Sequence, residues 1–286
     1  MRLVTFKQAG TTRIGAQTDD GVVDLNQADA GLPEEMVALL AGGPQALERA
    51  AEAVAGFSGA RLAEDEIELL APILNPPKMF GIGENYAAHA RETGNEPPEN
   101  VIVFAKYSST IIGPDAPIVL PRISQKVDYE AELGVVIGAP GRDIPPERAF
   151  DHVVGYVPFH DVSARDYQMR TSQWTLGKNF DTFSPMGPAL VTADEVPDPH
   201  NLGIRCRVSG ETLQEANTRD MIFDIPTLIA ELSSVMTLEI GDVIATGTPP
   251  GVGMARTPPR WLRPGDVAEV EIDGLGVLRN PVVAEG

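Results

Sequence analysis

The sequence predicts a mainly β fold of the α+β class, and three observations support this class. The 286 residues include 28 glycines and 25 prolines, a content that favours many turns and short strands over a helix bundle. Most segments after residue 75 are short apolar or alternating runs bounded by Gly or Pro, as in strands. Few segments show helical periodicity, so strands and helices do not alternate as they do in a doubly wound sheet.

The first 75 residues are expected to form a small N-terminal domain. A β-meander is predicted at its start, followed by short Ala/Leu/Glu-rich helices between 34 and 57 that Gly42-Gly43-Pro44 interrupts. The run 67–77 then carries three prolines after a change in composition, which is typical of a boundary. We therefore divide the chain into a small N-terminal domain, residues 1–75, and a larger second domain, residues 76–286.

The second domain is predicted to be rich in strands and poor in helices. One helix is expected at 85–93 and a longer one at 224–236, where Asp224 can cap the N-terminus and the apolar residues form one stripe. The expected strands lie at 79–82, 102–105, 129–137, 153–159, 187–191, 203–208, 243–246 and 267–272.

The charge balance excludes several classes of partner. The chain has 22 Lys and Arg against 41 Asp and Glu, a net charge of −19, which opposes binding to nucleic acid and to anionic membrane surfaces. No apolar run approaches the roughly 18–20 residues that span a bilayer, and no signal peptide is recognisable, so we expect a cytoplasmic protein. The single Cys206 excludes an intrachain disulfide and, with four histidines, a thiolate-rich zinc site.

Two glutamates on one predicted strand are the first candidates for a chemical site. Alternation along Asp128-Tyr-Glu-Ala-Glu-Leu-Gly places Glu130 and Glu132 on one face, about 7 Å apart, and apolar residues on the other. Two carboxylates at this spacing repel each other unless a cation lies between them. An acidic strand facing solvent would explain the same pattern, so the residues alone leave both interpretations open.

A third carboxylate follows the next predicted strand. Asp161 lies where an apolar run ends, a position that suits a metal ligand, although an Asx turn capping the loop is a serious alternative. Together, Glu130, Glu132 and Asp161 offer only oxygen ligands, which suit Mg²⁺, Mn²⁺ or Ca²⁺ and not zinc. Such a site would leave coordination positions for water and a chelating substrate.

Lys178 and a Gly/Pro loop are further candidates. Lys178 lies among apolar and small residues, so it could pair with an anionic substrate or with the acidic residues, although most lysines are simply solvated. The segment 241–253 is neither a P-loop nor a dinucleotide-binding motif. Its backbone N–H groups and the Thr248 hydroxyl could hold a carboxylate.

His89 and Glu92 form the last candidate pair. At i and i+3 on a short predicted helix they face the same way. A carboxylate beside an imidazole orients the ring and raises its basicity, as in a dyad that activates water. A surface pair without function is the common alternative.

Taken together, these segments resemble the fumarylacetoacetate hydrolase family from about Met79 to Leu278. Five motifs in the same order are far more specific than any one of them. They are Asn85-Tyr-x-x-His89-x-x-Glu92, Glu130-x-Glu132, His160-Asp161-x-x-x-Arg165-Asp-x-Gln168, Lys178-x-Phe-Asp-Thr-Phe and Thr246-Gly-Thr248-Pro-x-Gly-Val-Gly253.

The resemblance implies a mixed β-sandwich roll, a homodimer and a 2-oxo or diketo acid as the small-molecule substrate. It also implies roles for individual residues. Mg²⁺ or Mn²⁺, with Ca²⁺ as an alternative in a crystal, would be held by Glu130, Glu132 and Asp161; Lys178 would lie near the metal; Arg165, Gln168, Lys178 and Thr248 would contact substrate; and His89 with Glu92 would activate water on a mobile lid. Segment 1–75 resembles the accessory domain of longer bacterial members.

The function implied by the resemblance is metal-dependent hydrolysis of a C–C bond in an acylpyruvate or 2,4-diketo acid through a metal-stabilised enolate. One alternative is decarboxylation of a 2-oxo acid of the oxaloacetate type, and another is isomerisation of 2-hydroxyhepta-2,4-diene-1,7-dioate. A third is a non-catalytic calcium-binding β-domain. Lys178, His89 and Glu92 count against the third alternative, because a structural calcium site needs none of them.

Overall fold

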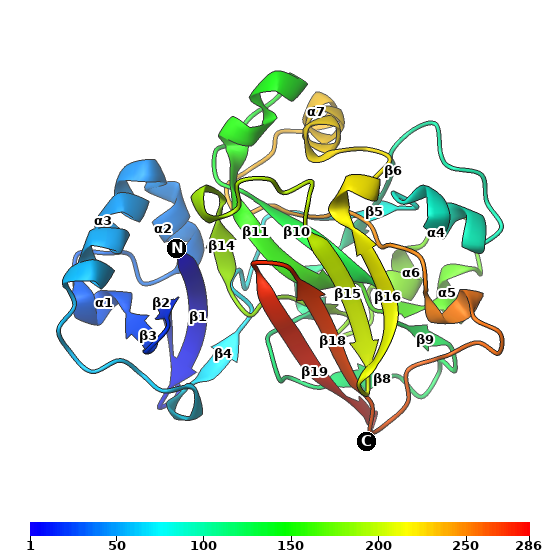
Figure 1. The fold of residues 1–286 in the computed structure, drawn as a ribbon, viewed down its shortest axis with the longest axis horizontal. Coiled ribbons are helices and arrows are strands. Elements are labelled where there is room, and N and C mark those ends of the chain that lie inside the picture. The colour runs from blue at the N-terminus through cyan, green and yellow to red at the C-terminus, as the bar shows by residue number, and fades with distance from the viewer.

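Two large β-sheets pack face to face in the computed structural model, which describes residues 1–286 apart from the side chain of Glu64. Figure 1 shows the five-stranded sheet lying across the strands of the ten-stranded sheet, with α7 near one end of the sandwich. The ten-stranded sheet runs in the order β3 (Gly21–Asp24), β2 (Thr11–Thr18), β1 (Arg2–Gln8), β14 (Leu190–Thr192), β11 (Val153–His160), β10 (Ala131–Ile137), β17 (Val243–Ala245), β5 (Met79–Gly83) and β6 (Ile102–Lys106), with β4 (Glu68–Leu70) also paired to β1.

The second sheet and two short strand pairs complete the β-structure. The five-stranded sheet has the order β16 (Glu211–Asn217), β15 (Gly203–Val208), β18 (Val267–Ile272), β19 (Gly276–Ala284) and β8 (Ile118–Leu120). The pairs are β12 (Ser163–Ala164) with β9 (Val127–Asp128) and β13 (Ser184–Pro185) with β7 (Ile111–Ile112). The helices are α1 (Leu25–Ala28), α2 (Met36–Ala41), α3 (Gly43–Gly56), α4 (Ala87–Glu92), α5 (Arg165–Gln168), α6 (Thr175–Lys178) and α7 (Ile225–Val235).

The strand that carries the acidic residues is buried on both faces. One face of β10 packs with Ile204, Val270 and α7 in the core between the sheets. The other face packs with residues of the N-terminal segment, among them Leu39 and Leu40 of α2. Glu130, just before β10, and Glu132 within it are themselves 3% and 1% exposed, which removes the solvent-facing strand as an interpretation of the Glu-x-Glu pattern.

The fold class is confirmed as mixed α+β with several sheets, and most predicted elements are present. The longer helix begins after Asp224, whose carboxylate accepts from the Thr227 N–H as an N-cap should. Several strands were not predicted from the sequence, and the longest of these are β16 and β19. β16 is an edge strand of mostly polar residues, and β19 contains Pro281, which weakens a strand pattern.

The N-terminal meander is continuous with the main sheet, because β1 pairs with β14 through Arg2 with Val191 and Leu3 with Leu190. The domain boundary at residue 75 is not tested by this pairing and stays a prediction. None of the described helices is long and apolar enough to cross a membrane.

Candidate active site

The three predicted carboxylates meet where β10 begins and β11 ends. The strands are antiparallel with Ala131 opposite His160, so the residues that flank this pair, Glu130 and Asp161, come together. The N–H of Asp161 donates to the carbonyl oxygen of Glu130 at 2.9 Å. Ligand atoms of Glu130, Glu132 and Asp161 all lie within 4.8 Å of one another, and all three residues are buried.

Buried cations already neutralise two of the three carboxylates. Glu130 lies 2.6 Å from Nη2 of Arg165 and 2.6 Å from Nζ of Lys178. Although burial raises the pKa of Glu130, the charges of Arg165 and Lys178 outweigh it and hold this pKa far below its usual value. Asp161 receives Lys178 Nζ at 2.6 Å and Lys106 Nζ at 2.5 Å, so its side chain binds two lysines and does not cap a turn.

Glu132 is the carboxylate that lacks a cation. In the described structure it accepts a hydrogen bond from the N–H of Gly247 at 3.0 Å and forms no ion pair. Burial, followed by the charges of Asp161 and Glu130, raises its pKa well above 4.5. A buried all-oxygen set with one uncompensated carboxylate fits a hard divalent cation, and Glu130, Glu132 and Asp161 are the residues that would hold it.

Lys106 is a site residue that the sequence motifs did not reveal. Its ammonium group is fully buried and donates to Asp161 Oδ1, to the carbonyl of Lys178 at 2.7 Å and to the carbonyl of Phe183 at 2.9 Å. Burial lowers the pKa of Lys106, although the charge of Asp161 acts against this shift. The signal in the sequence was alternation with the buried Phe104, which places Lys106 on the inward face of β6.

Asp128 is a second missed residue, and it fixes Arg165. Nε of Arg165 donates to Asp128 at 2.9 Å, and Nη1 donates to the side-chain oxygen of Gln168 at 2.9 Å. The fully buried Asp128 also accepts from the N–H groups of Gly253 and Met254. The guanidinium group is therefore held by α5 on one side and by the Gly/Pro loop on the other.

The Gly/Pro loop lies against β10, and Thr248 lies within it. The Thr248 hydroxyl donates to the carbonyl of Ala131 at 2.9 Å and accepts from Nε2 of Gln214 at 2.8 Å. Its proton is thus engaged by the strand, so this hydroxyl does not donate to a substrate in this arrangement. Gly247 has φ +100°, and a Cβ there would come within 2.7 Å of Asn85, so glycine is required for this turn.

His89 and Glu92 form the pair that their spacing predicted, and the pair is anchored to the body of the protein. Nδ1 of His89 lies 2.9 Å from Oε1 of Glu92. Glu92 in turn accepts from the N–H of Gly251 at 2.8 and 2.9 Å. His89 is only 6% exposed, which excludes a solvated surface pair. Because Nδ1 faces Glu92, Nε2 is left for a substrate or water.

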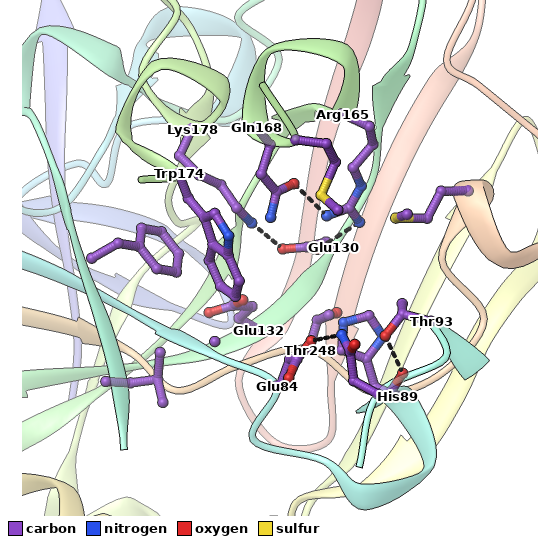
Figure 2. Close-up of a pocket in the computed structure, with 16 residues that line it drawn as sticks. Glu84, His89, Thr93, Glu130, Glu132, Arg165, Gln168, Trp174, Lys178 and Thr248 are labelled. Carbon is purple, nitrogen blue, oxygen red and sulfur yellow. Dashed lines mark hydrogen bonds and ion pairs between the residues drawn. The ribbon is translucent and has the colours of Figure 1, made fainter. Parts of the chain in front are cut away.

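A cavity of about 130 Å³ brings these groups together. Figure 2 shows Arg165, Gln168 and Lys178 on one side, Glu84, His89 and Thr93 on the opposite side, and Glu130 between them. Of the predicted residues, Glu130, Glu132, His89, Arg165, Gln168, Lys178 and Thr248 line the cavity. Asp161 and Glu92 lie behind this lining, in contact with Lys178 and His89.

Comparison with known proteins supports the resemblance drawn from the motifs. The family model described as fumarylacetoacetate (FAA) hydrolase C-terminal matches residues 78–283. The sequence is 51% identical over 289 residues to the mitochondrial oxaloacetate tautomerase fahd2 of Xenopus laevis, covering 99% of this chain and 90% of that relative.

Two solved structures extend the comparison to the fold. A fumarylacetoacetate hydrolase from Exiguobacterium antarcticum superposes with a TM-score of 0.87 at 38% identity, covering 100% of both chains. A maleylpyruvate hydrolase from Sphingobium sp. SYK-6, in complex with manganese(II) and pyruvate, superposes with a TM-score of 0.85 at 33% identity, again over 100% of both chains. The chain therefore belongs to the fumarylacetoacetate hydrolase family of enzymes.

Proposed function

We propose that this enzyme interconverts the keto and enol forms of a small 2-oxo acid with the help of a divalent metal. The observation that carries the proposal is an oriented His89–Glu92 pair facing a buried carboxylate triad across one small cavity. The tautomerase named among the relatives supports this reaction over the C–C hydrolysis that we expected first.

The triad, His89 and Glu92 would have different roles in a proton transfer between carbon and oxygen. A divalent cation such as Mg²⁺ or Mn²⁺, when held by Glu130, Glu132 and Asp161, supplies a Lewis acid for the 2-oxo group. Nε2 of His89 accepts the proton from carbon 3, the electrons of the broken C–H bond form the C2=C3 double bond, and the carbonyl π electrons move to oxygen. Glu92 stabilises the imidazolium ion, which then returns the proton to the oxygen.

The cations opposite the dyad would position the acid. Arg165 and Lys178 are both paired with Glu130; with a divalent cation also bound to the triad, they would provide positive charge for a substrate carboxylate, and the Gln168 amide lies beside them (Figure 2). Both cations are buried, so their attraction is screened less than that of surface groups. The enol would therefore form with its carboxylate facing this side and its reacting carbon facing His89.

C–C bond hydrolysis is the second candidate, and the neighbouring maleylpyruvate hydrolase favours it. In that reaction His89 would activate a water molecule instead of a C–H bond. The cleavage products of an acylpyruvate would be a carboxylic acid and the enol of pyruvate, so the same residues would serve both reactions.

One assay separates the two reactions. Oxaloacetate and acetylpyruvate are each mixed with the enzyme and Mg²⁺ or Mn²⁺, enol absorbance is followed, and products are identified by mass spectrometry. Tautomerisation speeds the approach to the keto–enol equilibrium without a change in mass, whereas hydrolysis of acetylpyruvate adds water and releases acetate and pyruvate. Pyruvate formed from oxaloacetate would instead indicate decarboxylation. The proposal fails if neither substrate responds to enzyme with metal beyond a control containing EDTA.

Three further expectations remain predictions of this proposal. They are a homodimer, a cytoplasmic location and a domain boundary at residue 75. Light scattering tests the first, and limited proteolysis of the full chain tests the boundary. The relative from Xenopus laevis is named as mitochondrial, so fractionation of the native cells would test the location directly.

A further inference from the structure

Glu84 places an uncompensated negative charge on the α4 side of the cavity. It follows β5, precedes α4 and lines the cavity beside His89 (Figure 2). Oε1 of Glu84 accepts a hydrogen bond from the Asn95 side-chain amide at 2.5 Å. Among the described side chains it forms no ion pair, in contrast to Glu130 and Asp161. Its charge is therefore available to act on whatever enters this end of the cavity.

The backbone at this position does not favour a glutamate. Glu84 has φ +53°, in the left-handed region where glycine or asparagine is accommodated more easily. Strained residues of this kind are concentrated at binding and catalytic sites, where the side chain has a use. The conformation directs Glu84 toward the cavity while its neighbour Asn85 turns into the core, where it is fully buried.

The two ends of the cavity differ in charge. Arg165 and Lys178 lie on one side, and Glu84 lies on the other, with the half-buried Trp174 and Met254 completing the lining. A 2-oxo acid has one carboxylate next to its oxo group. Arg165 and Lys178 are themselves paired with carboxylates, so it is with a divalent cation held by the acidic triad that positive charges outnumber negative ones at that end and attract the substrate carboxylate. The remainder of the molecule then extends toward His89 and Glu84. A second carboxylate there would meet a like charge that no cation offsets.

We infer that Glu84 selects 2-oxo acids whose distal end is neutral, such as acylpyruvates, over 2-oxo dicarboxylates such as oxaloacetate. This inference rests on the proposed function, since it assumes that a 2-oxo acid binds with its carboxylate toward Arg165. It makes Glu84 a specificity-determining residue, and it separates the preferred substrate of this chain from the one in the name of its tautomerase relative.

The test compares two substrates of similar size and different charge. Tautomerisation of acetylpyruvate and of oxaloacetate is measured with Mg²⁺ for the wild type and for Glu84→Gln, which keeps the shape and the Asn95 contact but removes the charge. The wild type is expected to favour acetylpyruvate in kcat/KM by about tenfold, the scale of a partly screened like-charge contact. Glu84→Gln should move this ratio about tenfold toward oxaloacetate.

Controls make each outcome decisive. Glu96→Gln removes the same charge from an exposed position shortly after α4, outside the cavity lining. It should leave the ratio of the two kcat/KM values within about twofold of the wild type, since a distant exposed charge is screened. Raising the salt concentration should reduce the wild-type preference, which gives a measurement without any variant. A wild-type preference for oxaloacetate, or a ratio that Glu84→Gln leaves unchanged, would overturn the inference. Absence of metal-dependent turnover with both substrates would instead contradict the proposed function.

Discussion

The two sides of the cavity are held in place by different means. On the body side, Arg165, Lys178 and Lys106 are buried and joined to carboxylates by ion pairs of 2.5–2.9 Å. On the opposite side, which we call the lid side because a mobile lid is predicted there, the six-residue helix α4 carries His89 and is connected to the body through the hydrogen bonds of Glu92 and Asn85. The charged groups that we propose for substrate and metal are thus fixed in the core, whereas the proposed acid–base group is on a short helix.

Substitutions on the two sides should therefore affect different properties of the enzyme. A helix of six residues has little stability of its own, so its position depends on a few tertiary contacts. Changes on the lid side should alter the rate of proton transfer and leave metal affinity alone, whereas changes on the body side should alter metal affinity first. We also expect the lid to move in the absence of substrate.

The largest effect is expected from Glu132→Gln on the body side. Three carboxylates bind a divalent cation as a unit, so calorimetry should detect no binding of Mn²⁺. Turnover should fall by roughly 10³-fold or more, because Lewis-acid stabilisation amounts to several kcal/mol. Asp181→Asn, an exposed acid outside the cavity lining, is the matched control and should retain metal binding.

The same variant tests the raised pKa of Glu132. A carboxyl group whose pKa is raised on folding stabilises the protein in its protonated form, and this stabilisation is lost as pH rises through the raised pKa. With EDTA present, Tm of the wild type should therefore fall relative to Tm of Glu132→Gln as pH increases. His160, whose pKa is lowered to about 3 by burial and by Lys106, acts equally in both proteins and cancels in this difference. A constant difference across pH would contradict the assignment.

On the lid side, His89→Ala should lower kcat by roughly 10²–10⁴-fold, the usual range for loss of a general base. Substrate Kd and metal affinity should barely change, because the carboxylate triad does not contact His89 in the described set of ion pairs. Stopped-flow kinetics measures kcat, and Mn²⁺ titration separately measures metal affinity. An unchanged kcat would mean that His89 is not the base and would favour decarboxylation, which needs none.

Much of the site could be predicted because its residues lie in local motifs. Alternation placed Glu130 and Glu132 together, i, i+3 spacing placed His89 beside Glu92, and the end of an apolar run marked Asp161. In each case a single element carries the signal. The predicted inward face of β10 is confirmed for the same reason, since Leu133 and Val135 are fully buried.

The residues that were missed depend on contacts between distant segments. Lys106 is 55 residues from Asp161, and Asp128 is 125 residues from Gly253. No local pattern indicates such a partner, because the sequence alone does not show whether the face of the strand that carries a lysine is exposed or buried. The burial of β10 on both faces likewise depends on α2, which lies in the N-terminal segment.

Lys106→Met is expected to have an intermediate effect. It tests whether protein stability and metal affinity depend on Lys106, which the sequence motifs did not reveal. Methionine fills a similar volume but leaves Oδ1 of Asp161 and two carbonyl groups without the donor that Lys106 supplies. Breaking a buried ion pair costs about 3 kcal/mol, which corresponds to a decrease in Tm of roughly 6–12 °C. Metal affinity should fall about 10–100-fold, as for other groups that support a metal ligand.

The control for Lys106→Met is Lys126→Met, which removes an exposed lysine. It should leave Tm and Mn²⁺ affinity unchanged within error. If Lys106→Met lowered Tm but left Mn²⁺ affinity intact, Lys106 would serve only the stability of the fold, and the ion pair with Asp161 would not support the metal site.

The smallest effect is expected from Thr93→Val at the end of α4. The Thr93 hydroxyl donates to the carbonyls of His89 and Ala90, so valine removes these hydrogen bonds from the last turn at nearly constant volume. Loss of about 0.5–1.5 kcal/mol should speed amide hydrogen exchange across 87–92 and lower kcat, each by roughly 2–10-fold. Thr93→Ser keeps the hydroxyl and should restore both values.

Metal affinity should stay constant in both variants, since no residue on the body side contacts Thr93 through a described hydrogen bond. A parallel loss of Mn²⁺ binding in Thr93→Val would show that the two sides of the cavity are coupled and that the lid helps to assemble the metal site.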